Sequence, residues 1–477
     1  MLLINKKINS LVWFLKFVLI LPLTLWVSAC ATTSIFDPYP HQIADVKTKI
    51  EQRSFEKPLK FLDKQRDSQD RTLYMLERGR VSQLQGEPDV SVKDFALAIK
   101  TESIADEKAV VSASDTAAKG AALITNDNAI PYRAASYERV MMHHYQAINY
   151  LMKKDLEGAG VEVRRAALEQ RDALERHNKE VAEAENKARE KKYDPSRHNE
   201  QVNRRFAAMY AAASDVKNSF QNAYTFYLSG LIYEKLGEPN DAYIDYKKAL
   251  EIFPDNPVLH KDLLRLAKLL GFREDYDIFE KKFGQQVSSS GIKQGDVVIL
   301  YEEGYVPVKD QVGIPLGTHN TIHTVAFPVY RDISSHRGAL TLNTTAGDIL
   351  KTSLICDFRA LAVKDLQEKM TGIIIRQVLR LIAKNGVRKT ADEHLGPAGA
   401  IAAILFNLIS EQADRRSWLT LPRNAQILRV SLPVGQQMLR INAANGKKDQ
   451  INIDVKENGL SIIHVVGTRK QLFTRVL

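Results

Sequence analysis

Cysteine is nearly absent from this chain of 477 residues, which contains only two, Cys30 and Cys356. So few cysteines exclude a disulfide-rich scaffold. The mean hydropathy of -0.26 excludes a protein built mainly from membrane-spanning helices. The formal net charge is +10, and the basic residues are spread along the chain rather than gathered into one patch. We therefore expect no nucleic-acid partner.

Motifs for catalysis and for cofactor binding are also missing. The chain has no HExxH, GxSxG, Walker loop, GxGxxG or CxxC pattern. His143 and His144 are neighbours in a predicted helix, where their rings point about 100° apart and cannot share a metal ion. His319 and His323 lie in or beside a predicted strand, which separates them by roughly 13 Å. The sequence thus predicts no metal, no cofactor and no catalytic residue, and the protein is not expected to be an enzyme.

Residues 1–29 have the layout of a secretory signal peptide. The positive charges of Lys6 and Lys7 come before an apolar run from Phe17 to Val27. This run of about eleven residues is shorter than the roughly twenty that span a bilayer, which disfavours the alternative of an uncleaved anchor helix. The segment Val-Ser-Ala-Cys that ends at Cys30 resembles the bacterial lipobox. In a lipobox the cysteine sulfur is lipidated and the preceding peptide is removed.

The lipobox resemblance implies that Cys30 attaches the chain to a membrane through its lipid. Three hydrocarbon chains on one cysteine are enough for stable anchoring. The residues that follow, Ala31 and Thr32, lack the aspartate that is associated with inner-membrane retention in Gram-negative bacteria. By similarity to that sorting rule, we expect the protein on the periplasmic face of the outer membrane.

The remaining sequence predicts a tether, a helical domain and a strand-rich domain. Residues 30–57 contain Pro38 and Pro40 and are expected to form the lipid-anchored tether. Residues 58–285 have helical periodicity, whereas residues 292–477 alternate between apolar and polar positions as strands do. The fold class expected is therefore α+β, with all-α helical repeats followed by a β-rich domain.

The helical part contains a repeat with tetratricopeptide spacing that starts at Ala223. Its small residues, aromatic residues and closing proline fall at the expected intervals: Phe226, Gly230, Tyr233, Leu236, Gly237, Ala242, Tyr246, Ala249 and Pro254. Small side chains allow two antiparallel helices to approach closely, and Tyr233 and Tyr246 are predicted to fill the seam between them. These two tyrosines are also candidate partner contacts, because stacked repeats commonly present a concave binding face.

Two weaker copies of the repeat precede this one. Gly86 to Ala98 aligns without gaps on Gly237 to Ala249, and Gly79 corresponds to Gly230. The other copy runs through Ala147, Tyr150, Ala159, Val163 and Ala166. The alternative is a general helical bundle with chance spacing. A long charged stretch between the copies predicts either a solvated helix or an arm that projects toward a partner.

The strand-rich part predicts an antiparallel sandwich or small barrel that is interrupted by a pair of helices. These helices are expected at about 363–385 and 396–412, and the second is rich in glycine and alanine. Cys356 lies within an apolar strand and is predicted to be a buried small side chain. Glu302 and Glu303 are neighbours in a strand, so their carboxylates should face opposite sides and not form an acid pair.

The most suggestive polar cluster is Asp414, Arg416 and Trp418, which lies where a helix returns the chain to a strand. One interpretation is an ion pair that clamps this junction. The other is a groove in which Arg416 and Trp418 contact a ligand such as a glycan or a lipid.

Several motifs together resemble a family of uncharacterised Gram-negative lipoproteins with tetratricopeptide-like helices and a β-rich C-terminal region. They are Tyr132-x4-Tyr-Glu-Arg139, Glu303-Gly-x2-Pro307, Ala326-Phe-Pro-x-Tyr330 and Glu411-Gln-Ala-Asp-x-Arg-x-Trp-x2-Leu-Pro422. Little activity is established for this family. Some members are encoded near lipoproteins that stimulate peptidoglycan synthases, which implies the peptidoglycan synthesis machinery as one candidate partner.

The sequence therefore predicts an outer-membrane-anchored periplasmic scaffold whose helical repeats hold another protein. The alternative is a cell-wall or lipid-binding protein or enzyme that uses the C-terminal domain. These hypotheses differ in whether Arg416 and Trp418 line an open pocket or lie inside a closed core.

Overall fold

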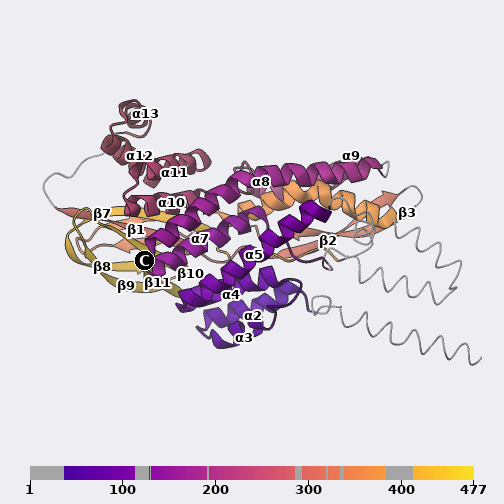
Figure 1. Cartoon of the computed structure of the whole chain (residues 1–477), viewed down its shortest axis with the longest axis horizontal. Helices are drawn as coiled ribbons and strands as arrows, with labels where there is room; N and C mark the ends of the chain where they lie inside the picture. The colour runs from indigo at the N-terminus through magenta and orange to yellow at the C-terminus, as the bar shows by residue number, and fades with distance from the viewer. Residues whose placement is uncertain are drawn as a thin grey trace, which may run out of the picture.

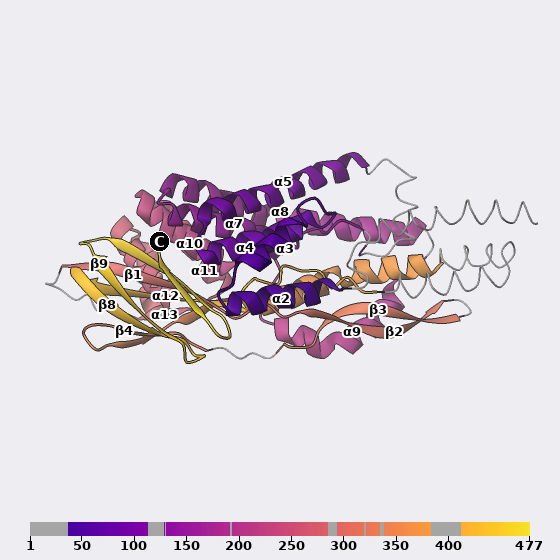
Figure 2. The same cartoon turned by 90° about the horizontal axis from the view of Figure 1, so that it is seen from below.

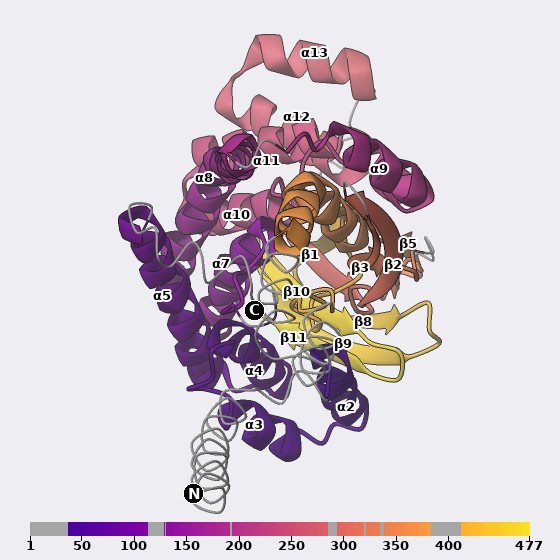
Figure 3. The same cartoon turned by 90° about the vertical axis from the view of Figure 1, so that its right-hand side faces the viewer.

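The computed structural model describes residues 37–112, 128, 130–190, 193–284, 293–318, 321–333, 338–382 and 412–477. Helices form one layer that curves around a central β-sheet, and a second sheet covers the opposite face of the first (Figures 1 and 3). The predicted signal peptide, Cys30, His319 and all but the last residue of the helix expected at about 396–412 lie outside the described residues. Among the described residues, none of the helices is both long enough and apolar enough to cross a membrane.

The helices before the sheets come mostly in antiparallel pairs. Their bounds are α2 Tyr39–Glu51, α3 Glu56–Asp63, α4 Arg71–Gln85, α5 Pro88–Ser112, α7 Ser136–Met152, α8 Leu156–Glu190, α9 Ser196–Tyr210, α10 Ala223–Leu236, α11 Pro239–Ile252, α12 Pro257–Leu270 and α13 Arg273–Phe283, with a short 3-10 turn at Ala211–Ala213. The pairs α4–α5, α7–α8, α10–α11 and α12–α13 stack in chain order, as repeats do.

The strands form three sheets. Their bounds are β1 Gln294–Glu303, β2 Lys309–Thr318, β3 Thr321–Tyr330, β4 Thr341–Asn343, β5 Ile349–Lys351, β6 Ser353–Asp357, β7 Asn424–Pro433, β8 Gly435–Asn442, β9 Lys448–Val455, β10 Leu460–Gly467 and β11 Leu472–Val476. The central sheet has the order β11-β10-β1-β7-β6, the outer sheet has the order β5-β4-β8-β9, and β2 and β3 form a hairpin. Strands β1 and β10 pair in parallel, which corrects the predicted antiparallel sandwich at this one pair. The other strand pairs of the described residues are antiparallel, as predicted.

The helix pairs share one structural register, which confirms the predicted repeats. The first helix of each pair ends beside a residue with positive φ: Gly86, Lys154, Gly237 and Gly271. The last two are 34 residues apart, and so are the asparagines Asn222 and Asn256, which cap the starts of α10 and α12. Equivalent positions in the four pairs can therefore be counted back from these turns.

Close helix approach in the strongest repeat depends on Gly230. A Cβ atom at this position would lie 2.3 Å from the ring of Tyr246, which is fully buried. In the first repeat a Cβ on Gly79 would lie 3.0 Å from Phe95, at the equivalent place. Both glycines thus let an aromatic ring fill the seam between the two helices.

The central sheet is buried on both faces. Val297, Ile299 and Tyr301 of β1 point into the core that this sheet shares with the outer sheet. The alternate residues Val298 and Leu300 belong to a larger core that includes the helices. The predicted sandwich is present, but the helical and strand-rich parts are not separate in their cores.

Helix α2 corrects the predicted tether over residues 39–57. Tyr39, Ile43, Val46 and Ile50 recur on one side of this helix and are buried in the main core. Pro38 and Pro40, which suggested a tether, instead lie at the start of the helix, where a proline needs no intrahelical partner for its missing N–H. The described chain is folded from this helix onward.

The long charged helix α8 is neither fully solvated nor free to project at its far end. Its Ala184 and Ala188 pack against Ile375 and Leu379. These partners belong to a helix over residues 358–382, which corresponds to the one predicted at 363–385 and starts earlier because Asp357 caps it by accepting a hydrogen bond from the Ala360 amide at 3.2 Å. The helices α8 and α9, this helix and the β2–β3 hairpin form one elongated end of the molecule (Figure 2).

Candidate functional site

The inner face of the helical array is the surface on which the repeat pattern predicted a partner. Counting back from the positive-φ turns places Arg80, Ile148 and Leu231 at one equivalent position of the first three pairs. All three are buried, and they lie in helices that face the central sheet. The chain's own sheet therefore covers this part of the concave face.

Two buried carboxylates on this face bind the segment just before β7. The Glu77 carboxylate of α4 accepts hydrogen bonds from the backbone amides of Leu419 at 2.7 Å and Thr420 at 3.1 Å. The Glu138 carboxylate of α7 accepts one from the Trp418 amide at 2.7 Å. Burial raises the pKa of both carboxyl groups, and their hydrogen bonds oppose that rise. These contacts fix the segment to the helices.

Arg416 and Trp418 lie inside this closed core. Trp418 is fully buried and its ring lies 5.6 Å from the rings of both Phe95 and Tyr145. The Arg416 guanidinium pairs with Asp414 at 2.8 Å and with Asp70 at 2.6 Å. The predicted clamp is confirmed. The predicted ligand groove at these two residues is wrong, because a buried side chain cannot meet a ligand from solvent.

A second polar centre surrounds Glu302 of β1. Its carboxylate pairs with the Arg80 guanidinium and lies 3.0 Å from His464 Nε2. It also accepts hydrogen bonds from the hydroxyls of Tyr145 at 3.2 Å and Tyr224 at 3.3 Å. Burial would raise the pKa of Glu302, but Arg80 and His464 outweigh this effect and lower that pKa to about 2. The Glu302 carboxylate is therefore charged, and it contacts all four of these side chains.

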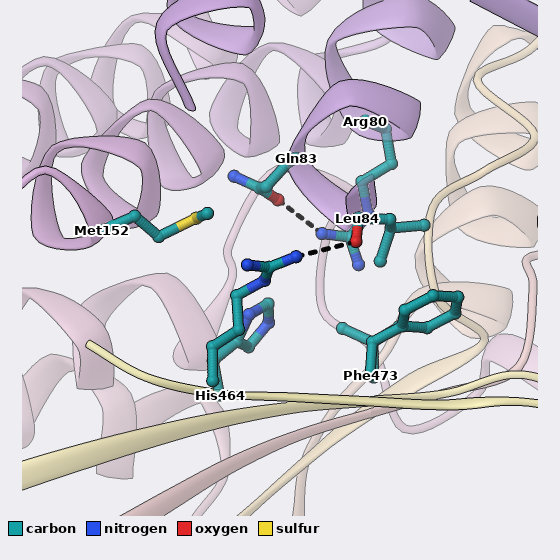
Figure 4. A pocket seen from close by; sticks show the side chains of 8 residues that line it. Arg80, Gln83, Leu84, Met152, His464 and Phe473 are labelled. Carbon is teal, nitrogen blue, oxygen red and sulfur yellow. Dashed lines mark hydrogen bonds between the residues drawn. The ribbon is translucent and has the colours of Figure 1, made fainter. Parts of the chain in front are cut away.

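A small hollow lies next to this centre, between α4 and the ends of β10 and β11. It is lined by Arg80, Gln83, Leu84, Met152, His464, Val466, Phe473 and Arg475, and its volume is about 10 Å³. Figure 4 shows Arg80 and Gln83 on one side of the hollow and His464 and Phe473 on the other. Such a volume holds about one water molecule and no organic substrate.

A third centre joins the later helices to the sheet through Arg429 of β7. Its guanidinium pairs with Glu234 of α10 at 2.8 Å, with Asp262 of α12 at 2.9 Å and with Asp296 at 2.6 Å. Burial would lower the pKa of Arg429, but Asp262 and Glu234 raise it well above its usual value. The three polar centres, which are Glu77 with Glu138, Glu302 and Arg429, span the interface from α4 to α12. Together they bind the helical and strand-rich parts into one structure.

The two tyrosines predicted as partner contacts have different environments. Tyr246 is fully buried in the seam of its repeat, so that it cannot contact a partner at the surface. Tyr233 is partly exposed, and its role as a contact stays a prediction. Cys356 is buried as predicted, and burial raises the pKa of its thiol well above the usual value.

The neighbouring histidines that were considered as metal ligands, His143 and His144, have different surroundings. His143 lies 2.7 Å from Glu162, whereas His144 packs against Tyr224 and lies 3.2 Å from the Thr225 hydroxyl. Burial lowers the pKa of His144 to about 3, so this ring is neutral. Within the part of the chain that the structure describes, no three metal-ligating side chains converge.

Little in the sequence indicates the carboxylate centres. Glu77, Glu138 and Glu302 lie in three different elements that meet only in the folded chain. Each acid directly follows an apolar or aromatic residue, but a charged residue comes next in every case, so that the local pattern does not mark any of the three as buried.

One comparison with known proteins, a family match, supports the repeat assignment. Residues 223–256 match the family described as tetratricopeptide repeat. No curated protein matches the chain. Similar solved structures include MamA, at 13% identity over 50% of this chain and 90% of that one, with a TM-score of 0.27. Another is the complex of the TPR2AB domain of yeast Sti1 with pHSP90, at 13% identity over 50% of this chain and 89% of that one, with a TM-score of 0.20. The family match over residues 223–256 shows that the chain contains tetratricopeptide-like helices, which are typical of protein-interaction scaffolds.

Proposed function

We propose that the protein is an outer-membrane-anchored periplasmic lipoprotein that acts as a non-enzymatic scaffold in cell-envelope assembly or maintenance. The observation that carries the scaffold role is the stack of four helix pairs in one register, of which residues 223–256 match a tetratricopeptide repeat. The anchor rests on the lipobox-like segment that ends at Cys30. The partner is a periplasmic protein, and the peptidoglycan synthesis machinery is one candidate.

The short spacing between Cys30 and helix α2 adds a geometric expectation to this proposal. The first described residue is Asp37, and seven residue steps of at most about 3.6 Å place Cys30 within about 25 Å of it. A lipid on Cys30 would therefore hold the folded body close to the membrane surface. Partners on the same membrane, or at its surface, are within reach.

The anchor is tested by metabolic labelling with a palmitate analogue. The wild-type chain is expected to incorporate the label, partition into detergent and fractionate with the outer membrane, whereas Cys30→Ser should lose the label. Ala31→Asp should shift the protein toward the inner membrane if the sorting rule applies. A wild-type chain that takes up no label contradicts the anchor.

The scaffold role is tested by crosslinking in intact envelopes. Removing the helical residues is unsuitable, because the cores of the two parts are shared. Exposed side chains of the array are replaced instead, so that the fold is retained. We expect such variants to lose a specific periplasmic partner. Recovery of only abundant porins from wild type and variants alike would contradict a scaffold.

A further inference from the structure

Helix α13 ends the stack of helix pairs, and one of its sides is exposed. Its other side packs mainly against α12, with Phe279 buried and with Tyr276 and Phe283 half-buried beside it. Figure 1 shows α13 at the edge of the molecule, away from the sheets. In an array of repeats, the outer side of the last helix is the one that a further repeat would cover.

The exposed side of α13 carries its charges in a fixed order. Successive residues of an α-helix are about 100° apart, so positions separated by three, four, seven or eight residues share one side. On α13 the exposed residues with this spacing are Glu274, Asp277, Ile278, Lys281 and Lys282. Two acids come first, one isoleucine lies in the middle and two lysines come last. We name these five residues the α13 face.

The charges of the α13 face are not neutralised within the described part of the chain. None of its four charged residues takes part in an ion pair there. Asp275, which does pair with Lys247 at 3.2 Å, lies to one side of this face. The Lys282 ammonium lies 5.3 Å from the ring of Phe283, which leaves its charge available. Ile278 is 60% exposed, so that the face presents pairable charges around one apolar side chain.

We propose that the α13 face binds the α13 face of a second copy of this chain, with the two helices antiparallel about a two-fold axis near Ile278. The order of the charges selects this occupant. Reversing an identical helix places its lysines opposite Glu274 and Asp277, and the same two-fold axis places its acids opposite Lys281 and Lys282. The two isoleucines meet at the centre. A parallel copy would instead bring like charges together.

The size of the α13 face determines how strong this contact is expected to be. A helix of eleven residues is about 16 Å long, so two such helices bury well under the roughly 1,600 Å² of a standard stable interface. We therefore expect a weak and reversible contact, with a Kd of about 0.1 to 1 mM. Copies that share one membrane would meet at an effective concentration of about this size. The contact itself needs no anchor, and it goes beyond the function proposed above.

The competing explanation is that these charges serve only their own helix. Acids near the start of a helix and lysines near its end stabilise it through the helix dipole, and isolated apolar residues are common on protein surfaces. This explanation predicts no contact between copies, and it predicts that one charge variant has no effect on another.

Disulfide trapping in the full chain tests the two-fold contact, because a residue near the axis meets its own copy. Cys30→Ser removes the first of the two native thiols and Cys356 is buried, so that Ile278→Cys adds the one accessible thiol. Under mild oxidation in detergent, we expect it to form dimers at least about fivefold faster than the control Ile349→Cys, because a disulfide requires closely approaching Cβ atoms. Ile349 is 68% exposed on β5. Equal rates at the two positions overturn the proposal.

Charge variants in the Ile278→Cys chain test the pairing. Lys281→Glu with Lys282→Glu makes the face acidic throughout, and Glu274→Lys with Asp277→Lys makes it basic throughout. Each variant alone should trap dimers about fivefold more slowly, since like charges then face each other. An equimolar mixture should regain dimers that contain one chain of each kind, which the helix dipole cannot explain. Undiminished trapping in the separate variants, or no recovery in the mixture, overturns the proposal.

The outcome is distinguishable from failure of the proposed function. The trapping uses the Cys30→Ser chain, so that it requires neither a lipid nor a periplasmic partner. Equal trapping at Ile278 and Ile349 would leave fatty-acid labelling and envelope crosslinking of the wild-type chain unaffected. All changed side chains of the α13 face are exposed, so that thermal unfolding should remain close to wild type and serves as the folding check.

Discussion

Lys154 has a left-handed backbone conformation at a position where the other three helix pairs have glycine. Its φ is 62°, and the corresponding residues in the other pairs are Gly86, Gly237 and Gly271. A non-glycine residue in this left-handed region costs about 1 kcal/mol. Lys154→Gly is therefore expected to stabilise the protein by about 1 kcal/mol in urea unfolding. Lys153→Gly, next to it in a helical conformation, should bring no gain, and equal effects of both would contradict this account.

Glu302 provides a prediction for pH dependence. Its pKa is lowered to about 2 in the folded protein, against 4.5 for an ordinary glutamate. A lowered carboxyl pKa stabilises the fold above about pH 4.5, and this contribution, at most about 3 kcal/mol, is lost as the pH falls toward 2. Glu234 is lowered to about 2 as well and acts in the same direction, since Arg429 and Arg265 outweigh its burial.

Glu302→Gln should cost about 3–5 kcal/mol at pH 7, because it leaves the buried Arg80 without its anion. The difference from wild type should narrow as the pH falls from about 4.5 toward 2, because Glu302 takes up a proton in the unfolded chain before it does so in the folded protein. Urea unfolding across this pH range measures the effect. The exposed Glu457→Gln is the control, and a Glu302→Gln deficit that is independent of pH would contradict the assigned charge.

At the scale of elements, helix α2 is part of the fold rather than a tether. Ile43 is fully buried, so Ile43→Ala should lower the free energy of unfolding by about 3 kcal/mol. Asp45→Ala, at an exposed position of the same helix, should change it by less than about 0.5 kcal/mol. Chemical denaturation of the full chain measures both effects. If Ile43→Ala leaves the free energy of unfolding unchanged, these residues form a tether after all and the account of α2 is contradicted.

The helix pairs were predictable because their signals are local. Gly230 and Tyr246 are sixteen residues apart and mark one repeat by themselves, as Gly79 and Phe95 do in the first. Helix α2 was not predicted because Pro38 and Pro40 are typical of an extended tether, although its buried side chains have helical spacing. The parallel pairing of β1 with β10 was missed because nothing in either strand specifies a partner so far along the chain.

The buried polar centres could not be predicted because their residues are far apart in the sequence. Arg80, Glu302 and His464 lie in α4, β1 and β10, so that their meeting depends on how the sheet docks on the helices. For Arg416 and Trp418 the sequence suggested a site that the fold does not form. Their residue types suggested a ligand, and only the packing around them shows that they bind the chain to itself.

At the scale of the whole molecule, the helices and the central sheet form one unit. A single core contains buried residues from α2 through α13 together with residues of β1, β7 and β10. Three buried polar centres cross the interface, and breaking any of them would leave a polar or charged group without its partner inside the protein. A concave face filled in this way is a permanent part of the fold, so that partners would have to bind to exposed surfaces elsewhere on the molecule.

The most direct test of this central claim is to cut the chain between its two parts. A protease site is inserted between Gly284 and Lys293, the purified protein is cleaved there, and the product is followed by size exclusion and by calorimetry. The account predicts that the two pieces remain together under native conditions and unfold in one cooperative transition. Pieces that separate and stay folded, or two independent transitions in the uncut chain, would contradict it.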